Sequence, residues 1–168
     1  MGKRSDFERV EKDLYRTIDK RAVEALEPHL VCQTFAEPCV GEGDLKRDLE
    51  SWGYECTWES DLSTGRDALS LTGYEMSAEC IITNPPWSRP ILHKMIEHFV
   101  EIARCSWLLF DADWAHTKQS APYMKWCSDI VSVGRLIWIP GTTTSGKDNC
   151  AWYRFSSSAR QTIFHGRR

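Results

Sequence analysis

Apolar residues recur along the chain with two spacings, and these predict alternating helices and strands. Spacings of three and four residues predict helices over 5–28, 44–52 and 91–102, with a break at 15–18 that indicates a short loop. Runs rich in β-branched and aromatic residues predict strands over 31–35, 54–58, 80–83, 107–110, 130–133, 136–139 and 150–155. This alternation predicts a mostly parallel α/β sheet. The strands on either side of 140–149 are expected to form an antiparallel hairpin, and residues 165–168 a loose basic tail.

Composition narrows the class of protein. The chain has 168 residues, 42% of them hydrophobic and 27% charged, which suits one soluble domain over 1–168. No apolar run reaches the ~18 residues that span a bilayer, and the first residues lack the apolar stretch of a secretion signal. We therefore expect a cytoplasmic protein without a membrane segment. The seven cysteines are scattered without a C-x-x-C pair, so we expect reduced thiols, no disulfide and no metal.

Charge is divided unevenly between the two halves of the chain. Residues 1–80 carry 10 Lys and Arg against 18 Asp and Glu, a balance of −8, whereas residues 81–168 carry 11 against 6, a balance of +5. Such asymmetry is typical of a protein whose basic side meets a polyanion. Chance sorting of surface charge is the alternative interpretation.

The segment from Glu37 to Gly43 is the first candidate binding element. Its G-x-G follows a predicted strand and precedes a predicted helix, where glycines permit a tight turn beside a ligand. It lacks the third glycine of the dinucleotide fingerprint, and the acid four residues before Gly41 suits a cationic ligand better than a phosphate. About 20 residues further on, Asp61, or Glu59 as the alternative, is placed to accept hydrogen bonds from ribose hydroxyls. Asp67 is placed to receive an adenine amino group. Solvated loop carboxylates and an ordinary strand-to-helix turn are the alternative interpretations of these acids and of the glycine segment.

The most specific signal is the segment Thr83-Asn84-Pro85-Pro86-Trp87 after an apolar strand. Two consecutive prolines fix the backbone and remove two N–H donors, which leaves carbonyl groups as acceptors. Asn84 adds an amide oxygen, and Trp87 offers a flat apolar face. Two acceptors and a stacking ring together suit a planar amino group, which is what methylation of an exocyclic amine requires. A rigid turn that covers the edge of the core is the alternative.

With these motifs, the chain resembles class I S-adenosylmethionine-dependent methyltransferases of the amino-methylating type, similar to bacterial and phage DNA adenine-N6 methyltransferases. The resemblance implies a Rossmann-like seven-stranded sheet with an antiparallel final strand. In such sheets the first and fourth strands are neighbours, so Gly41 after the first strand and Asn84 after the fourth are expected to adjoin. We expect an N-terminal helical cap over 1–30 and no separate target-recognition domain, and the lack of that domain is a departure from the family. The resemblance also implies a catalytic tetrapeptide made of Asn84, Pro85, Pro86 and Trp87. It further implies that S-adenosylmethionine is bound by Tyr15, Thr17, Glu37, Pro38, Gly41, Gly43, Asp61, Asp67 and Asn84.

The acceptor is less sharply defined than the cofactor. Trp87 replaces the more usual Tyr or Phe, so adenine in RNA, cytosine N4 and a glutamine amide remain alternatives to DNA adenine, as does a non-catalytic cofactor-binding subunit. Candidate contacts to nucleic acid, which is expected to be DNA and preferably single-stranded, are Arg89, Asp113, Trp114, His116 and Lys147. Trp114 could equally be a core aromatic. The segment 141–148 nearly matches a nucleotide-binding P-loop, but a strand follows it where a P-loop leads into a helix.

Overall fold

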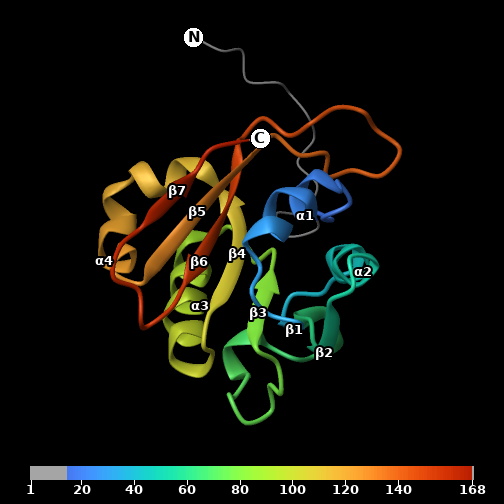
Figure 1. Cartoon of the computed structure of the whole chain (residues 1–168). Coiled ribbons are helices and arrows are strands. Elements are labelled where there is room, and N and C mark those ends of the chain that lie inside the picture. The colour runs from blue at the N-terminus through green and yellow to red at the C-terminus, as the bar shows by residue number, and fades with distance from the viewer. Residues whose placement is uncertain (1–14, 168) are drawn as a thin grey trace.

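The computed structural model describes residues 15–167 and is a three-layer α/β structure (Figure 1). The predicted helix at 5–14 lies outside the described residues. The helices are α1 (Arg21–Leu26), α2 (Asp44–Ser51), α3 (Arg89–Ile102) and α4 (Ala121–Met124). The strands are β1 (Thr34–Glu37), β2 (Glu55–Glu59), β3 (Cys80–Thr83), β4 (Ser106–Asp111), β5 (Cys127–Gly134), β6 (Cys150–Phe155) and β7 (Ile163–His165). Single 3-10 turns occupy Glu27–His29, Leu62–Thr64, Ala68–Ser70, Ala112–His116 and Lys118–Ser120.

All seven strands form one sheet in the order β2-β1-β3-β4-β6-β5-β7. Strands β1 to β4 pair in parallel, and β6 runs antiparallel to both of its neighbours, β4 and β5. The predicted α/β class with a mostly parallel sheet and a C-terminal antiparallel hairpin is therefore confirmed. The antiparallel strand is β6, however, and not the last strand of the chain, because β7 pairs in parallel with β5.

The predicted strand over 136–139 is wrong. β5 ends at Gly134, whose φ of +91° turns the chain out of the sheet. The segment after it packs over the sheet instead, with Leu136 and Trp138 buried in a core cluster. The hairpin partner of β6 is β5 itself.

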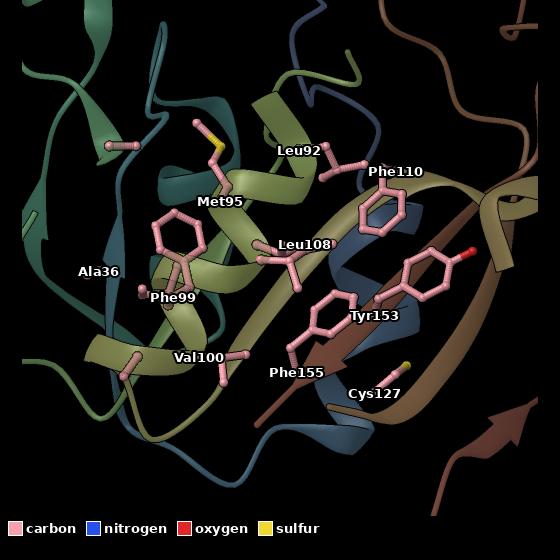
Figure 2. Close-up of a cluster of buried hydrophobic side chains, with 14 of the residues drawn as sticks. Ala36, Leu92, Met95, Phe99, Val100, Leu108, Phe110, Cys127, Tyr153 and Phe155 are labelled. Carbon is pink, nitrogen blue, oxygen red and sulfur yellow. The ribbon is translucent and has the colours of Figure 1, made fainter. Parts of the chain in front are cut away.

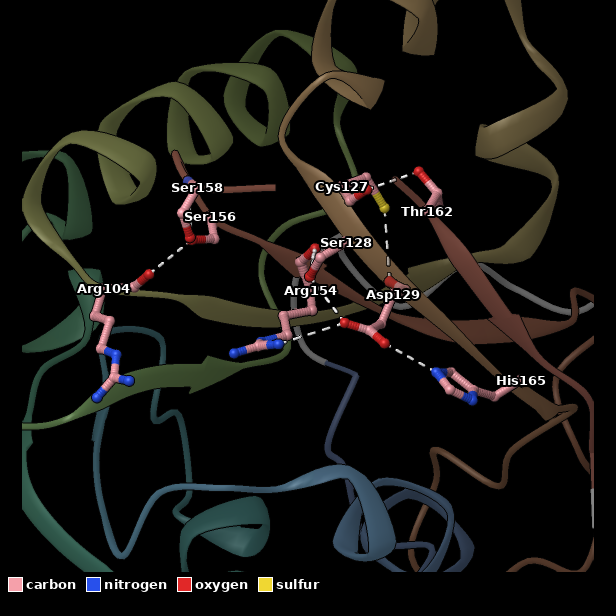
Figure 3. A network of polar contacts seen from close by, with 9 residues as sticks. All are labelled: Arg104, Cys127, Ser128, Asp129, Arg154, Ser156, Ser158, Thr162 and His165. Atoms are coloured by element: carbon pink, nitrogen blue, oxygen red, sulfur yellow. Dashed lines mark hydrogen bonds and ion pairs between the residues drawn. The ribbon is translucent and has the colours of Figure 1, made fainter. Parts of the chain in front are cut away.

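The expected loose tail is also partly wrong, because His165 belongs to β7 (Figure 3). Side chains fasten this short strand to β5. The Thr162 hydroxyl donates to the Cys127 carbonyl at 2.7 Å, and His165 Nε2 lies 2.9 Å from Asp129 Oδ1.

The two faces of the sheet bury separate apolar clusters, because successive strand residues point to opposite faces. On β4, Leu108 and Phe110 pack with α3 in one cluster, shown in Figure 2, while Trp107 and Leu109 pack with α1 and α2 in the other. The parallel strands read as continuous apolar runs for this reason, as expected of strands covered on both sides.

Candidate active site

The two candidate motifs lie side by side at one edge of the sheet. β1 pairs in parallel with β3, with Phe35 opposite Cys80 and Ala36 opposite Ile81. The turn that follows β1 and the tetrapeptide that follows β3 therefore leave the sheet at the same edge, the carboxyl ends of the parallel strands, where ligands bind in open α/β folds. The expected adjacency of the two motifs is confirmed, although the strand before Asn84 is the third of the chain. The implied fourth-strand position fails because 60–79 holds only 3-10 turns.

Glu37 ends β1 and is a buried acid with an unused oxygen. Its side chain is 1% exposed, and its Oε2 atom has no hydrogen-bond partner. Burial raises the pKa of Glu37 well above its ordinary value; the neighbouring Thr83 hydroxyl opposes this shift, and Glu59 and Asp61 add to it. A buried acceptor of this kind is suited to a cationic donor from outside the chain.

The turn after Glu37 depends on its two glycines. Gly41 and Gly43 have φ values of +50° and +76°, and Gly43 is the N-cap of α2. A Cβ atom at Gly43 would also approach Arg47 Nη1 at 3.0 Å. Pro38, which lies between the end of β1 and the two glycines, is buried. The turn therefore begins at a buried proline and ends at the N-cap of α2.

Asp61 ties the turn to β2. Its carboxylate accepts hydrogen bonds from the backbone N–H groups of Gly41 and Ser63, each at 2.9 Å. The alternative acid, Glu59, instead forms an ion pair with Lys46 at 2.6 Å and is half exposed. Asp67 is exposed and caps a 3-10 turn by accepting from the Leu69 N–H. Of the three acids, Asp61 is the one that contacts the glycine turn.

Asn84 is held from both sides of its amide. Its Nδ2 group donates to the Thr17 hydroxyl at 3.0 Å, and its Oδ1 atom accepts from the Trp87 indole N–H at 3.1 Å. Asn84 is partly exposed, whereas Pro85 beneath it is buried. The tetrapeptide thus presents a fixed amide at the sheet edge.

Residues 15–19, which we call the strap, cross this edge and join its parts. Arg16 forms a bidentate pair with Asp44 at the start of α2, at 2.6 and 2.9 Å. Thr17, 8% exposed, contacts Asn84, and Asp19 accepts from the Ile137 backbone N–H at 2.9 Å. The strap therefore connects the start of α2, the tetrapeptide and the segment after β5.

Aromatic rings line the same edge. The rings of Trp87 and Trp138 meet edge to face at 5.8 Å and 86°, and Tyr15, 45% exposed, lies 6.3 Å from Trp138. Sequence reasoning missed Trp138, because it read this residue as part of a strand. The pattern offered no other signal for it.

The predicted nucleic-acid contacts have different surroundings. Arg89 pairs with Asp111 at 2.7 Å, and Trp114 is fully buried and donates to His93 at 3.1 Å. Trp114 is therefore a core residue, the alternative that the sequence left open, and no contact with nucleic acid is expected of it. Exposed positions at the sheet edge are occupied by Asp113, His116 and Lys147.

The P-loop-like segment has a packing explanation. A Cβ atom at Gly146 would meet Trp138 Nε1 at 2.8 Å, and the Gly146 N–H donates to the Leu136 carbonyl at 2.7 Å. The strand β6 follows, as the sequence indicates. Gly146 is thus required by the indole beneath it.

Residues 15–167 contain neither a membrane-spanning helix nor a metal-binding cluster of side chains. In this part of the chain, no helix has the length and apolar character needed to cross a membrane. Among the same residues, no cluster of His, Cys, Asp and Glu side chains is arranged to hold a metal ion. All seven cysteines are free.

No protein-family model and no curated protein matches the sequence. Solved structures do match the fold. A proposed RNA methyltransferase from Pyrococcus horikoshii is similar over 95% of this chain and 93% of its own, with 18% identity and a TM-score of 0.55. A proposed class I S-adenosylmethionine-dependent methyltransferase from Listeria monocytogenes is similar over 94% of this chain and 67% of its own, with 10% identity and a TM-score of 0.61. The type IIG restriction endonuclease BpuSI is similar over 90% of this chain and 26% of its own, with 11% identity and a TM-score of 0.56. The chain therefore has the Rossmann-like fold of class I methyltransferases.

Proposed function

We propose that this chain transfers a methyl group from S-adenosylmethionine to the N6 amine of adenine in DNA. The observation that carries the proposal is the Asn84 amide. It is fixed at the end of β3 by Thr17 and Trp87, and it stands beside the acidic glycine turn of the neighbouring β1. A methyl donor and an amine bound in these two places would adjoin.

The tetrapeptide supplies what a weak amine nucleophile needs. The lone pair of an exocyclic amine is delocalised into the ring, and accepting both of its N–H bonds frees that pair to point at a methyl donor. Asn84 Oδ1 and the Pro85 carbonyl are the expected acceptors, because Pro85 and Pro86 provide no N–H groups to compete. Trp87 is expected to stack on the base. Orientation of this kind supplies several kcal/mol of the barrier, on the order of the gains known for intramolecular reactions.

The residues after β1 fit the donor. The unpaired Oε2 of Glu37 suits the ammonium group of an amino acid, and the positive φ values at Gly41 and Gly43 let the backbone turn away to leave room. Asp61 uses two of its roughly four acceptor positions on backbone N–H groups, so it retains capacity for ribose hydroxyls. When bound, S-adenosylmethionine supplies a methyl group on a positively charged sulfur. The remaining expected contacts are Tyr15, Thr17, Pro38, Asp67 and Asn84.

Nucleic acid is the expected acceptor because several observations agree on it. Residues 81–168 carry a balance of +5, and two of the similar structures are named as an RNA methyltransferase and a restriction endonuclease. Asp113, His116 and Lys147 occupy loops at the edge where β3 ends, since Asp111 pairs with Cys150 there. A small enzyme avoids the few kcal/mol needed to flip a paired base if it acts on single strands.

Incubation of the purified chain with a tritiated methyl donor and separate pools of single-stranded DNA, RNA and protein tests the proposal. Label in adenine of DNA is expected, and N84A should abolish it while S-adenosylhomocysteine still binds through the expected contacts other than Asn84. The matched control is Q33A, because Gln33 is exposed and precedes β1, away from the site. Label in RNA, in cytosine or in protein would show that this molecule, and not adenine of DNA, is the methyl acceptor. Absence of label from every pool would overturn the proposal in favour of a non-catalytic partner subunit.

A further inference from the structure

The amide of Asn84 has one orientation, and Trp87 determines it. Trp87 Nε1 lies 3.1 Å from Asn84 Oδ1, while Thr17 Oγ1 lies 3.0 Å from Asn84 Nδ2. A threonine hydroxyl both donates and accepts, so Thr17 accommodates the amide either way round. An indole N–H only donates. Rotation of the amide by half a turn would place its NH2 group against that N–H, so Trp87 selects the orientation in which the oxygen faces the indole.

The indole is itself firmly held. Trp87 packs at the sheet edge against both apolar clusters and meets Trp138 edge to face at 5.8 Å. Its N–H group is therefore a fixed donor and not a mobile one. Phe or Tyr at the same position has no N–H at this point of the ring, so such a residue could not select the amide orientation in this way.

The Asn84 amide oxygen can accept a second hydrogen bond besides the one from Trp87. A carbonyl oxygen has two lone pairs, and Trp87 uses one of them, which leaves the other for the N–H of an acceptor amine. From this geometry we infer that Trp87 is a positioning residue that keeps the Asn84 oxygen, and not its NH2 group, turned toward the acceptor amine. This inference rests on the proposed function and assigns to the tryptophan a task separate from stacking on the base.

The first test is W87F, which keeps an aromatic ring and removes the N–H. We expect about a fivefold decrease in kcat, because a neutral hydrogen bond is worth roughly 1 kcal/mol, and about 1.4 kcal/mol corresponds to a factor of ten. KM for the oligonucleotide and the dissociation constant for S-adenosylhomocysteine should stay within about twofold of the wild type. W52F provides the matched control, because Trp52 is 48% exposed at the end of α2.

The second test separates orientation from stacking and from folding. In an N84D background both terminal atoms of the side chain are oxygens, so orientation no longer matters, and the further change W87F should lower kcat by a clearly smaller factor than it does when residue 84 is Asn. An equal loss in the wild-type and N84D backgrounds would overturn the inference and assign Trp87 to stacking or stability. Replacement of Trp87 by 3-benzothienylalanine, a ring of the same shape without the N–H, should reproduce the W87F loss, and full activity of that protein would also overturn the inference. If the wild type labels no pool at all, the proposed function fails and this inference fails with it.

Discussion

Substitution of Glu37 by Gln is expected to have two effects: it stabilises the fold at high pH, and it weakens cofactor binding. Glu37 is 1% exposed and its Oε2 atom is unpaired. Burial raises the pKa of this carboxyl well above its ordinary value of 4.5. Between pH 4.5 and the raised pKa, the folded chain therefore keeps a proton on Glu37 that the unfolded chain has already lost.

The direction and size of the pH effect follow from that one proton. The contribution of Glu37 to stability is fully present below pH 4.5, the ordinary pKa, and is lost as the pH rises through the raised pKa of the folded state. Within this window, the free energy of unfolding falls by about 1.4 kcal/mol per pH unit relative to a variant that cannot ionise. The difference between E37Q and the wild type should therefore grow with pH and then level off.

Urea unfolding of both proteins at half-unit steps from pH 4.5 to 8.5 measures this difference. The variant E50Q, at an exposed position on α2, controls for the loss of one negative charge. E37Q should also bind S-adenosylhomocysteine more weakly, because the ammonium group of this ligand favours the ionised carboxylate and Gln cannot ionise. Parallel stability curves for E37Q and the wild type would refute the assignment of Glu37 as a protonated buried acid.

Two further predictions concern the packing around the site. Gly146→Ala should lower the free energy of unfolding by about 1–3 kcal/mol, because its Cβ would meet Trp138 Nε1 at 2.8 Å; Gly166→Ala, which meets nothing within 4 Å, should have no effect in the same urea titration. Trp152→Phe should cost about 2 kcal/mol, because it shrinks a fully buried side chain and removes its 2.8 Å hydrogen bond to the Ala22 carbonyl. An unchanged urea midpoint for Trp152→Phe would contradict that reasoning.

The parts of the fold that were predictable are those whose patterns are local. The apolar period of 91–102 gave α3 to within two residues of its start, and the apolar runs at 80–83 and 107–110 gave β3 and β4. The segment 136–139 misled the prediction because Leu136 and Trp138 alternate as in a strand. Their burial comes from packing over the sheet after the turn at Gly134. Periodicity reports which residues are buried and not what buries them.

The candidate site also has a part that the sequence could predict and a part that it could not. The sequence could single out Glu37, Gly41 and the tetrapeptide as candidates because each motif is a continuous stretch of chain, and the parallel sheet brings the ends of the two motifs together. The surroundings of the expected substrate contacts were not predictable. Arg89 is paired with an acid 22 residues away, and Trp114 is inside the core. An isolated polar or aromatic residue in a sequence carries no signal that distinguishes an open position from a satisfied one.

The strap shows that a motif can locate an amide without giving every contact that holds it. Its contacts to Asp44, Asn84 and Ile137 span 28, 67 and 118 residues, and each depends on how separate layers of the fold meet. Asn84 donates one hydrogen bond to Thr17 of the strap and accepts the other from Trp87. The strap therefore holds the amide in place, and the last residue of its own motif sets the direction of its oxygen. Because a Tyr or Phe at that last position has no equivalent donor, chains that differ only there must fix the same amide by other contacts. The identity of the aromatic residue therefore bears on how the amide is held.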